Sequence, residues 1–206
     1  MKIIISILIN TFLFVANING QENFNLSSDF LQYNKSLNRF YDTIAPTLLK
    51  NLSKKPIARF IPIYTMGQGG CLVSIEKDSL DKPKLITHCY SFKKIISNKK
   101  NVNIEEKSIY ISSDLSNKIV KLFELAISKI NKEKSSFGLD GITYMFVVRN
   151  SNGNLIIAEF WSPEKGTAIN KIITLCNELA IITNGDQEFT NKVSKKTDKL
   201  IAELEK

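Results

Sequence analysis

The stretch that decides the fold is ITYMFVVRNSNGNLIIAEFW, residues 142–161. Its two halves, residues 142–149 and 155–161, are rich in β-branched and aromatic residues, which favour strands. Asn152-Gly153 lies between them and favours the positive φ angles of a two-residue type I′ turn, so the stretch is predicted to form a β-hairpin. Under that turn the opposed pairs are Val147 and Ala158, Met145 and Phe160, and Tyr144 and Trp161.

Two helices are predicted after the hairpin. Ser162-Pro163-Glu164 offers an N-cap, a proline for the first turn and an acidic side chain near the N-terminus. The apolar stripe of this helix is Ile169, Ile172, Ile173, Cys176 and Leu179, and Asn184-Gly185 is predicted to end it. A last helix begins at about Gln187, with the stripe Phe189, Val193, Leu200, Ile201 and Leu204.

A second hairpin is predicted upstream, from residues 71–77 and 85–92 around a turn at residues 78–83. The register that keeps Cys71, Val73 and Ile75 on one face also places Cys71 opposite Cys89. Opposed residues have Cβ atoms about 4.5–5.5 Å apart, close to what a disulfide needs. We therefore predict a disulfide between Cys71 and Cys89 and a free, buried thiol at Cys176.

The remaining segments complete the expected layout. Residues 57–64 are rich in β-formers, but Pro62 lacks a backbone donor, which predicts an edge strand or an irregular extended segment. Residues 28–52 are interpreted as a helix that Pro46 interrupts, residues 93–107 as a loop and residues 108–111 as a short strand. A helix capped by residues 112–114 follows, with the apolar set Leu115, Ile119, Leu122, Phe123, Ala126, Ile127 and Ile130.

This order of elements predicts the fold class. Neighbouring strands are joined by short turns, which favours antiparallel pairing, and the helices are amphipathic. We expect an α+β fold with a mainly antiparallel sheet of about five or six strands and three or four packed helices. The length of 206 residues and the 43% apolar composition are typical of one globular domain, here residues 21–206.

The first twenty residues, MKIIISILINTFLFVANING, have the order of a secretory signal peptide. Lys2 precedes an apolar run that is too short to span a bilayer comfortably, and a polar stretch follows it. We expect cleavage after Gly20 or a few residues away, a secreted or periplasmic location, and no transmembrane segment in the mature chain. An oxidising compartment is also where a structural disulfide persists.

The pieces Asp140-Gly141-Ile142-Thr143-Tyr144 and Trp161-Ser162-Pro163-Glu164-Lys165-Gly166-Thr167 carry a resemblance. The chain resembles a group of uncharacterised secreted bacterial proteins with the pattern D-G-x-T-Y, a hairpin, W-S-P-x-x-G-T and an amphipathic helix. The similarity covers about residues 139–180. It brings no activity with it.

The sequence does not favour several common catalytic and metal-binding motifs. Gly67-Gln68-Gly69-Gly70 precedes a strand and lacks the Gly-Lys-Ser/Thr of a phosphate loop. Cys71 and His88 are predicted on opposite faces of the hairpin, which disfavours a cysteine–histidine pair. One His and three Cys give no zinc spacing, and we expect no cofactor. Glu159 is a carboxylate on an otherwise apolar strand, interpreted as an edge or partnered residue rather than a general acid.

The excess of basic residues gives a formal net charge of +8, which favours an acidic surface as the binding partner rather than nucleic acid. Only three of the 28 basic residues are Arg, the residue that base readout and bidentate phosphate contacts favour. The excess lies in the loop at Lys93, Lys94, Lys99, Lys100 and Lys107, which is either a solvated loop or a docking surface for an acidic partner.

Size, export and the lack of a visible catalytic constellation favour an exported protein that acts by binding, in the manner of an inhibitor or immunity protein. The expected partner is a protein or an envelope polymer of acidic character. Two alternatives stay open: a cell-envelope hydrolase whose carboxylates the sequence cannot pair, and a carrier of a small apolar ligand.

Overall fold

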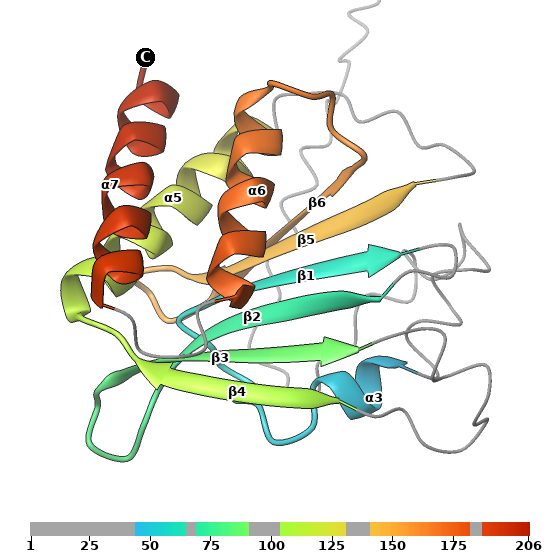
Figure 1. Cartoon of the computed structure of the whole chain (residues 1–206), viewed down its shortest axis with the longest axis vertical. Coiled ribbons are helices and arrows are strands. Elements are labelled where there is room, and N and C mark those ends of the chain that lie inside the picture. The colour runs from blue at the N-terminus through green and yellow to red at the C-terminus, as the bar shows by residue number, and fades with distance from the viewer. Residues whose placement is uncertain (1–43, 65–68, 91–103, 131–140, 182–186) are drawn as a thin grey trace, which may run out of the picture.

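The structure is a computed structural model, and it describes residues 44–64, 69–90, 104–130, 141–181 and 187–206. Its described part is an α+β domain with one six-stranded antiparallel sheet of order β4-β3-β2-β1-β5-β6 (Figure 1). The strands are β1 (Ala58–Tyr64), β2 (Gly70–Lys77), β3 (Pro83–Tyr90), β4 (Glu105–Tyr110), β5 (Ile142–Arg149) and β6 (Leu155–Trp161). The helices are α3 (Ala45–Leu48), α5 (Ser113–Ile130), α6 (Ala168–Ile181) and α7 (Gln187–Leu204). The expected fold class is confirmed.

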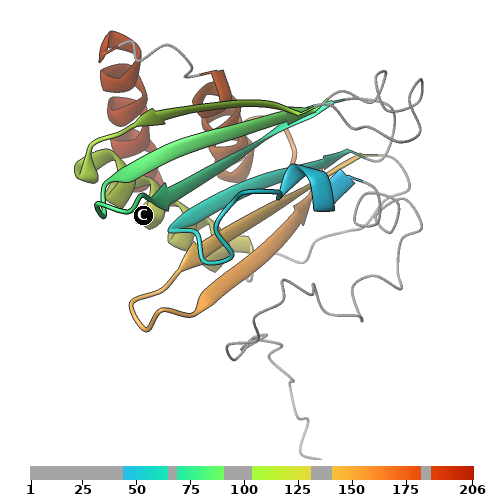
Figure 2. The same cartoon turned by 90° about the horizontal axis from the view of Figure 1, so that it is seen from below.

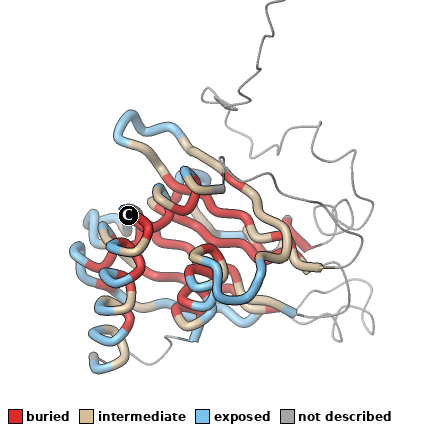
Figure 3. The backbone as a smooth tube through the Cα atoms, turned by 90° about the horizontal axis from the view of Figure 1, so that it is seen from above, coloured by how far each residue is buried: buried red, intermediate tan, exposed pale blue. Residues whose placement is uncertain are grey.

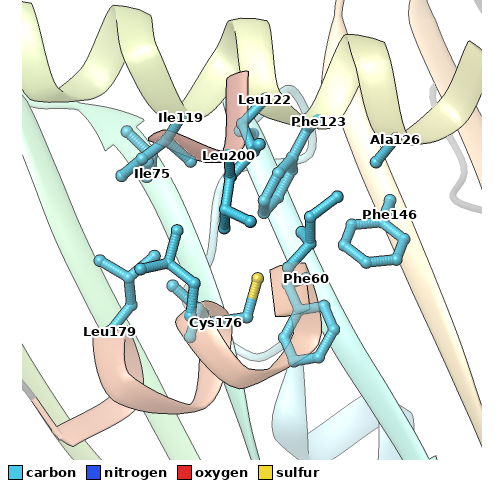
Figure 4. Packing of buried hydrophobic residues seen from close by; sticks show 14 of the residues in the cluster. Phe60, Ile75, Ile119, Leu122, Phe123, Ala126, Phe146, Cys176, Leu179 and Leu200 are labelled. Atoms are coloured by element: carbon cyan, nitrogen blue, oxygen red, sulfur yellow. The ribbon is translucent and has the colours of Figure 1, made fainter. Parts of the chain in front are cut away.

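The two faces of the sheet are covered unequally. The helices α5, α6 and α7 lie on one face, and the single turn α3 lies on the other (Figures 1 and 2). The larger core lies under the three helices, where Phe146 packs between Phe60 and Phe123 with ring centroids 5.3 and 5.2 Å apart (Figure 4). A smaller core joins α3 to the second face through Leu48, Ile61, Ile63, Leu72, Met145 and Val147.

The amphipathic helices are confirmed. In α5 the Ser112 hydroxyl accepts a hydrogen bond from the Leu115 amide at 3.1 Å, which is the predicted N-cap. The predicted stripes of α5, α6 and α7 are buried wherever the structure describes their side chains, except Phe189, which is half-buried. The exposed residues lie mainly on the outer faces of the helices and at the turns (Figure 3).

The placement of β1 at an edge is wrong. β1 lies between β2 and β5, and it pairs with β5 over its whole length but with β2 only from Ala58 to Phe60. Pro62 lies past the end of the β1–β2 ladder, and the Tyr90 hydroxyl donates to its carbonyl oxygen at 3.4 Å. In an antiparallel strand the N and the carbonyl oxygen of one residue point to the same neighbour. The nitrogen of Pro62 therefore points toward β2, where the β1–β2 ladder has already ended at Phe60 and no N–H is needed. A central strand can for this reason contain the proline.

The β5–β6 hairpin forms in a register one residue from the predicted one. Met145 pairs with Glu159 and Phe146 with Ala158. The Asn150 amide donates to the Asn154 carbonyl at 2.9 Å, and Gly153 has φ of 81° while Asn152 keeps a negative φ. The loop is thus three residues ending in a left-handed glycine, not a two-residue type I′ turn. The Asn150 side chain favours this wider loop, because its Oδ1 accepts from the amides of Asn152 and Asn154 at 3.0 and 2.9 Å.

Ser162 does not cap a helix, which corrects the predicted helix start. Its amide donates to the Ile142 carbonyl at 2.9 Å and its hydroxyl accepts from the Ile142 amide at 3.0 Å, so it extends the hairpin. The cap is Thr167, whose hydroxyl accepts from the Asn170 amide at 3.2 Å, and α6 begins at Ala168. The predicted helix end at Asn184-Gly185 lies outside the described residues.

The helix predicted over residues 28–52 is described only from residue 44, where α3 contributes a single turn with Pro46 near its start. The strand predicted at residues 108–111 begins earlier, since Glu105 already pairs with Cys89 of β3. This pairing removes residues 105–107 from the predicted loop.

Both halves of the motif quoted above meet at the open end of the hairpin. Beyond the two hydrogen bonds between Ile142 and Ser162, a Cβ added at Gly141 would lie 2.7 Å from the Trp161 ring. Such a contact is shorter than packed carbon atoms allow, so Gly141 is required by close approach. Asp140 lies outside the described residues.

Candidate functional site

The strand β6 forms one edge of the described sheet, and its composition is unusual for an edge. Six of its seven residues, LIIAEFW, are apolar, and all but Ala158 are only half-buried. Its one hydrogen-bonded neighbour among the described strands is β5. An apolar edge strand is a template for pairing with another chain.

The opposite edge, β4, has a different character. Glu105, Glu106 and Lys107 carry charges along it, five of its six residues are exposed, and Lys107 pairs with Glu105 at 2.8 Å. Charged side chains of this kind are how proteins discourage edge-to-edge pairing. The two edges of one sheet therefore differ, and only β6 offers an apolar ladder.

The hairpin hydrogen bonds fix which backbone groups of β6 point away from β5. The backbones of Ser162 and Asn154 form hydrogen bonds with Ile142 and Asn150, at the two ends of the hairpin. In an antiparallel pair, every second residue forms hydrogen bonds with the neighbouring strand. Ile156, Ala158 and Phe160 therefore face β5. The outward N–H and C=O groups are those of Leu155, Ile157, Glu159 and Trp161.

Unpaired polar side-chain atoms gather on the α3 side of β5 and β6. Among the described residues, the buried atoms Arg149 Nε, Glu159 Oε2 and Trp161 Nε1 have no hydrogen-bond partner. The register places all three on one face, because Glu159 opposes Met145, Trp161 opposes Thr143 and Arg149 opposes Leu155. Burial raises the pKa of Glu159 to about 8. Buried polar atoms usually have partners, and these three have none within the part of the chain that the structure describes.

Among the residues that the structure describes, no other carboxylate is placed beside Glu159 on β5 or β6. Glu76 and Glu106 share its sheet face but lie on β2 and β4. Glu76 is held by Arg59 at 2.9 Å, and Glu106 lies 3.3 Å from His88 Nε2. Within the described part of the chain, Glu76, Glu106 and Glu159 therefore do not form the close carboxylate pair of a glycoside hydrolase.

His88 is buried, whereas the sequence placed it at the surface or at the boundary between sheet and helices. It is 2% exposed on the α3 side, and its Nδ1 lies 2.6 Å from the Leu48 carbonyl oxygen. A carbonyl only accepts, so Nδ1 carries the proton and His88 fixes α3 to β3. Cys71 lies on the opposite face, as predicted, because His88 pairs with Leu72. The two side chains cannot form a catalytic pair.

The predicted disulfide is present. Cys71 pairs with Cys89 with an S–S distance of 2.07 Å, in the predicted register with Val73 opposite Thr87 and Ile75 opposite Leu85. Cys176 is a free, fully buried cysteine on α6, and burial raises the pKa of its thiol (Figure 4).

Replacing both Cys71 and Cys89 with alanine is expected to lower the free energy of unfolding by about 3 kcal/mol, because the disulfide closes a loop in the unfolded chain. Urea unfolding of the oxidised wild type and the double variant measures this loss. Thiol counting on denatured, non-reduced protein should find one free thiol in the wild type. Replacing Cys176 with alanine serves as the control and should remove that thiol while leaving the disulfide intact.

The five lysines of the predicted basic loop do not come together in the described part of the structure. Lys93, Lys94, Lys99 and Lys100 lie outside the described residues. Lys107 is not a loop residue: it lies in β4, opposite Thr87, and pairs with Glu105. The sequence alone did not indicate that β6 lies at an edge of the sheet. The apolar run LIIAEFW was visible, but a strand becomes an edge only through the order of the whole sheet.

Comparison with known proteins returns no match to a family model, a curated protein or a solved structure. No helix among the described residues is long and apolar enough to cross a membrane. In the same part of the chain, no group of three or more His, Cys, Asp or Glu side chains could hold a metal ion.

Proposed function

We propose that this chain is an exported protein that acts by binding another protein, and that β6 is its docking strand. The observation that carries the proposal is the apolar edge of β6, with outward backbone groups at four alternating residues and a charged, protected edge on the other side of the sheet. An extended segment of a partner would add to this edge by main-chain hydrogen bonds.

The side chains beside the edge would supply specificity. The buried N–H groups of Trp161 and Arg149 have no acceptor within the described residues, and Phe160 and Ile156 are half-buried on the helix side. Aromatic and Arg side chains are the residues that carry most of the energy in protein interfaces. The net charge of +8 favours a partner with an acidic surface.

Export is part of the same proposal. It is supported by the signal-like residues 1–20 and by the Cys71–Cys89 disulfide, which persists in an oxidising compartment. An inhibitor-like or immunity-like role fits a small exported domain that occupies a partner through one edge.

The test is affinity capture with immobilised mature protein and an envelope extract of its own host. Ile157→Pro removes an outward N–H while sparing the bonds to β5, and proline is tolerated at such edge positions. Ser108→Pro is the matched control, because Ser108 is an exposed residue whose amide points outward from β4.

We expect the wild type and Ser108→Pro to capture the same envelope protein, and Ile157→Pro to capture at least tenfold less of it. Circular dichroism checks that each variant is folded. Equal retention by all three proteins would contradict docking through β6, and no retention by the wild type would contradict a stable protein partner in the envelope.

A further inference from the structure

We infer that β6 pairs antiparallel with β6 of a second copy of this chain, about a two-fold axis at Ala158, so that one continuous sheet runs through both copies. The inference rests on the proposed function, since it names a second copy as an occupant of the same docking strand, one that an envelope protein would have to displace. It is carried by the backbone pattern, the side-chain pairs and the charge of β6.

The backbone pattern is self-complementary. Outward-facing residues of one strand must oppose outward-facing residues of the other to exchange hydrogen bonds. Pairing centred on Ala158 opposes Leu155 with Trp161 of the second copy and Ile157 with Glu159 of the second copy. All four outward residues are then used in both copies, giving about eight main-chain hydrogen bonds. The same register overlaps the full seven residues of β6, and any shift shortens the ladder.

The opposed side chains also match. On the α3 side Leu155 meets Trp161 of the second copy, and on the helix side Ile156 meets Phe160 of the second copy. Aromatic and aliphatic cross-strand pairs of this kind stabilise sheets. Arg149 lies beside Leu155 on the same face, which brings its guanidinium within reach of the Trp161 ring of the second copy, as a cation–π contact requires.

Charge does not oppose this contact. β6 holds no Lys or Arg, and its single acidic residue, Glu159, would face Ile157 of the second copy rather than another carboxylate. The charged strand β4 lies at the far edge of the sheet in each copy. Charges beyond about 8 Å are largely screened at physiological salt, so the +8 of each chain acts weakly across this edge.

The first test is the mass of the oxidised mature protein in solution, by light scattering at about 1 and 100 μM. We expect twice the chain mass at the higher concentration for the wild type and for Ser108→Pro. Ile157→Pro should give the mass of one chain. A single-chain mass for the wild type at both concentrations overturns the inference, and so does a dimer that Ile157→Pro leaves intact.

The second test fixes the register and does not depend on Ile157→Pro folding. Ala158→Cys places a cysteine on the two-fold axis, opposite itself, where cross-strand Cβ atoms are close enough for a disulfide. Non-reducing electrophoresis should show a covalent dimer that a reductant splits. Ile156→Cys is the matched control, because it would face Phe160 of the second copy and should stay single. Cross-linking of both variants alike overturns this register.

The two proposals fail separately. A wild type that stays monomeric but retains an envelope protein through β6 overturns the second copy and keeps the docking strand. A dimer that forms through Ala158, with envelope capture that Ile157→Pro does not change, keeps the second copy and removes the envelope partner from β6.

Discussion

Replacing Arg59 with methionine is expected to lower the free energy of unfolding by about 3–5 kcal/mol, because the change leaves a buried carboxylate without its cation. Arg59 is 2% exposed and Glu76 is 7% exposed. The guanidinium donates to Glu76 Oε1 at 2.9 Å, to the Ser53 carbonyl at 2.7 Å and to the Ser74 hydroxyl at 3.1 Å. Glu76 in turn accepts from the Ser53 amide at 2.9 Å, so the pair anchors the segment after α3 to β1 and β2.

Urea unfolding of the single variant, of Glu76→Leu and of the double variant measures the coupling. The double variant should lose less than the two single losses together, because it buries no unpaired charge. Lys77→Ala is the control: Lys77 forms an exposed pair with Asp81, worth less than about 1 kcal/mol. A loss at Arg59 as small as the loss at Lys77 would contradict a buried, coupled pair.

Replacing Glu159 with glutamine is expected to stabilise the protein at pH 8 and to flatten its pH dependence. The pKa of Glu159 is raised from 4.5 to about 8 by burial. Between these values the folded protein holds a proton that the unfolded chain has lost, so the free energy of unfolding falls as pH rises. The slope approaches about 1.4 kcal/mol per pH unit, giving about 3–5 kcal/mol over the whole window.

Glutamine does not titrate, so the variant should lack this slope, and its gain over the wild type should level off above about pH 8. The measurement is urea unfolding of both proteins at several pH values from 4 to 9, at a concentration low enough to keep a single chain. Glu164→Gln is the matched control, since Glu164 is exposed just after β6. Parallel pH profiles for the wild type and Glu159→Gln would show that folding does not raise the pKa of this carboxyl.

The sequence predicted correctly those features that depend on residues close together in the chain. The disulfide follows from the alternation of Cys71, Val73 and Ile75, because one slipped residue would turn every side chain to the other face. The helix α5 follows from the Ser112 cap and a 3.6-residue apolar period. These features need no knowledge of distant segments, and the structure confirms them.

Nonlocal pairing decided what the sequence could not. Pro62 indicated an edge strand, yet β1 is central because its ladder with β2 stops before the proline. Asn152-Gly153 indicated a two-residue turn, yet the Asn150 side chain stabilises a longer loop. The candidate site depends on the same kind of information. β5 pairs with β1 and not with β4, the strand before it in the sequence, and this pairing leaves β6 at the edge of the sheet.

The central position of β1 has a consequence for the order in which the sheet forms. The strands β2, β3 and β4 pair with sequence neighbours, so this part of the sheet, with its Cys71–Cys89 disulfide, can form before the remaining strands join it. β1 must wait for its other neighbour, because Phe60 pairs with Phe146 from the far half of the chain. Contacts of such long sequence separation slow folding, since the connecting loop is ordered before they form. We expect the sheet to be completed late, when the β5–β6 hairpin docks on β1, and until then the apolar edge of β1 is the surface most exposed to misassembly.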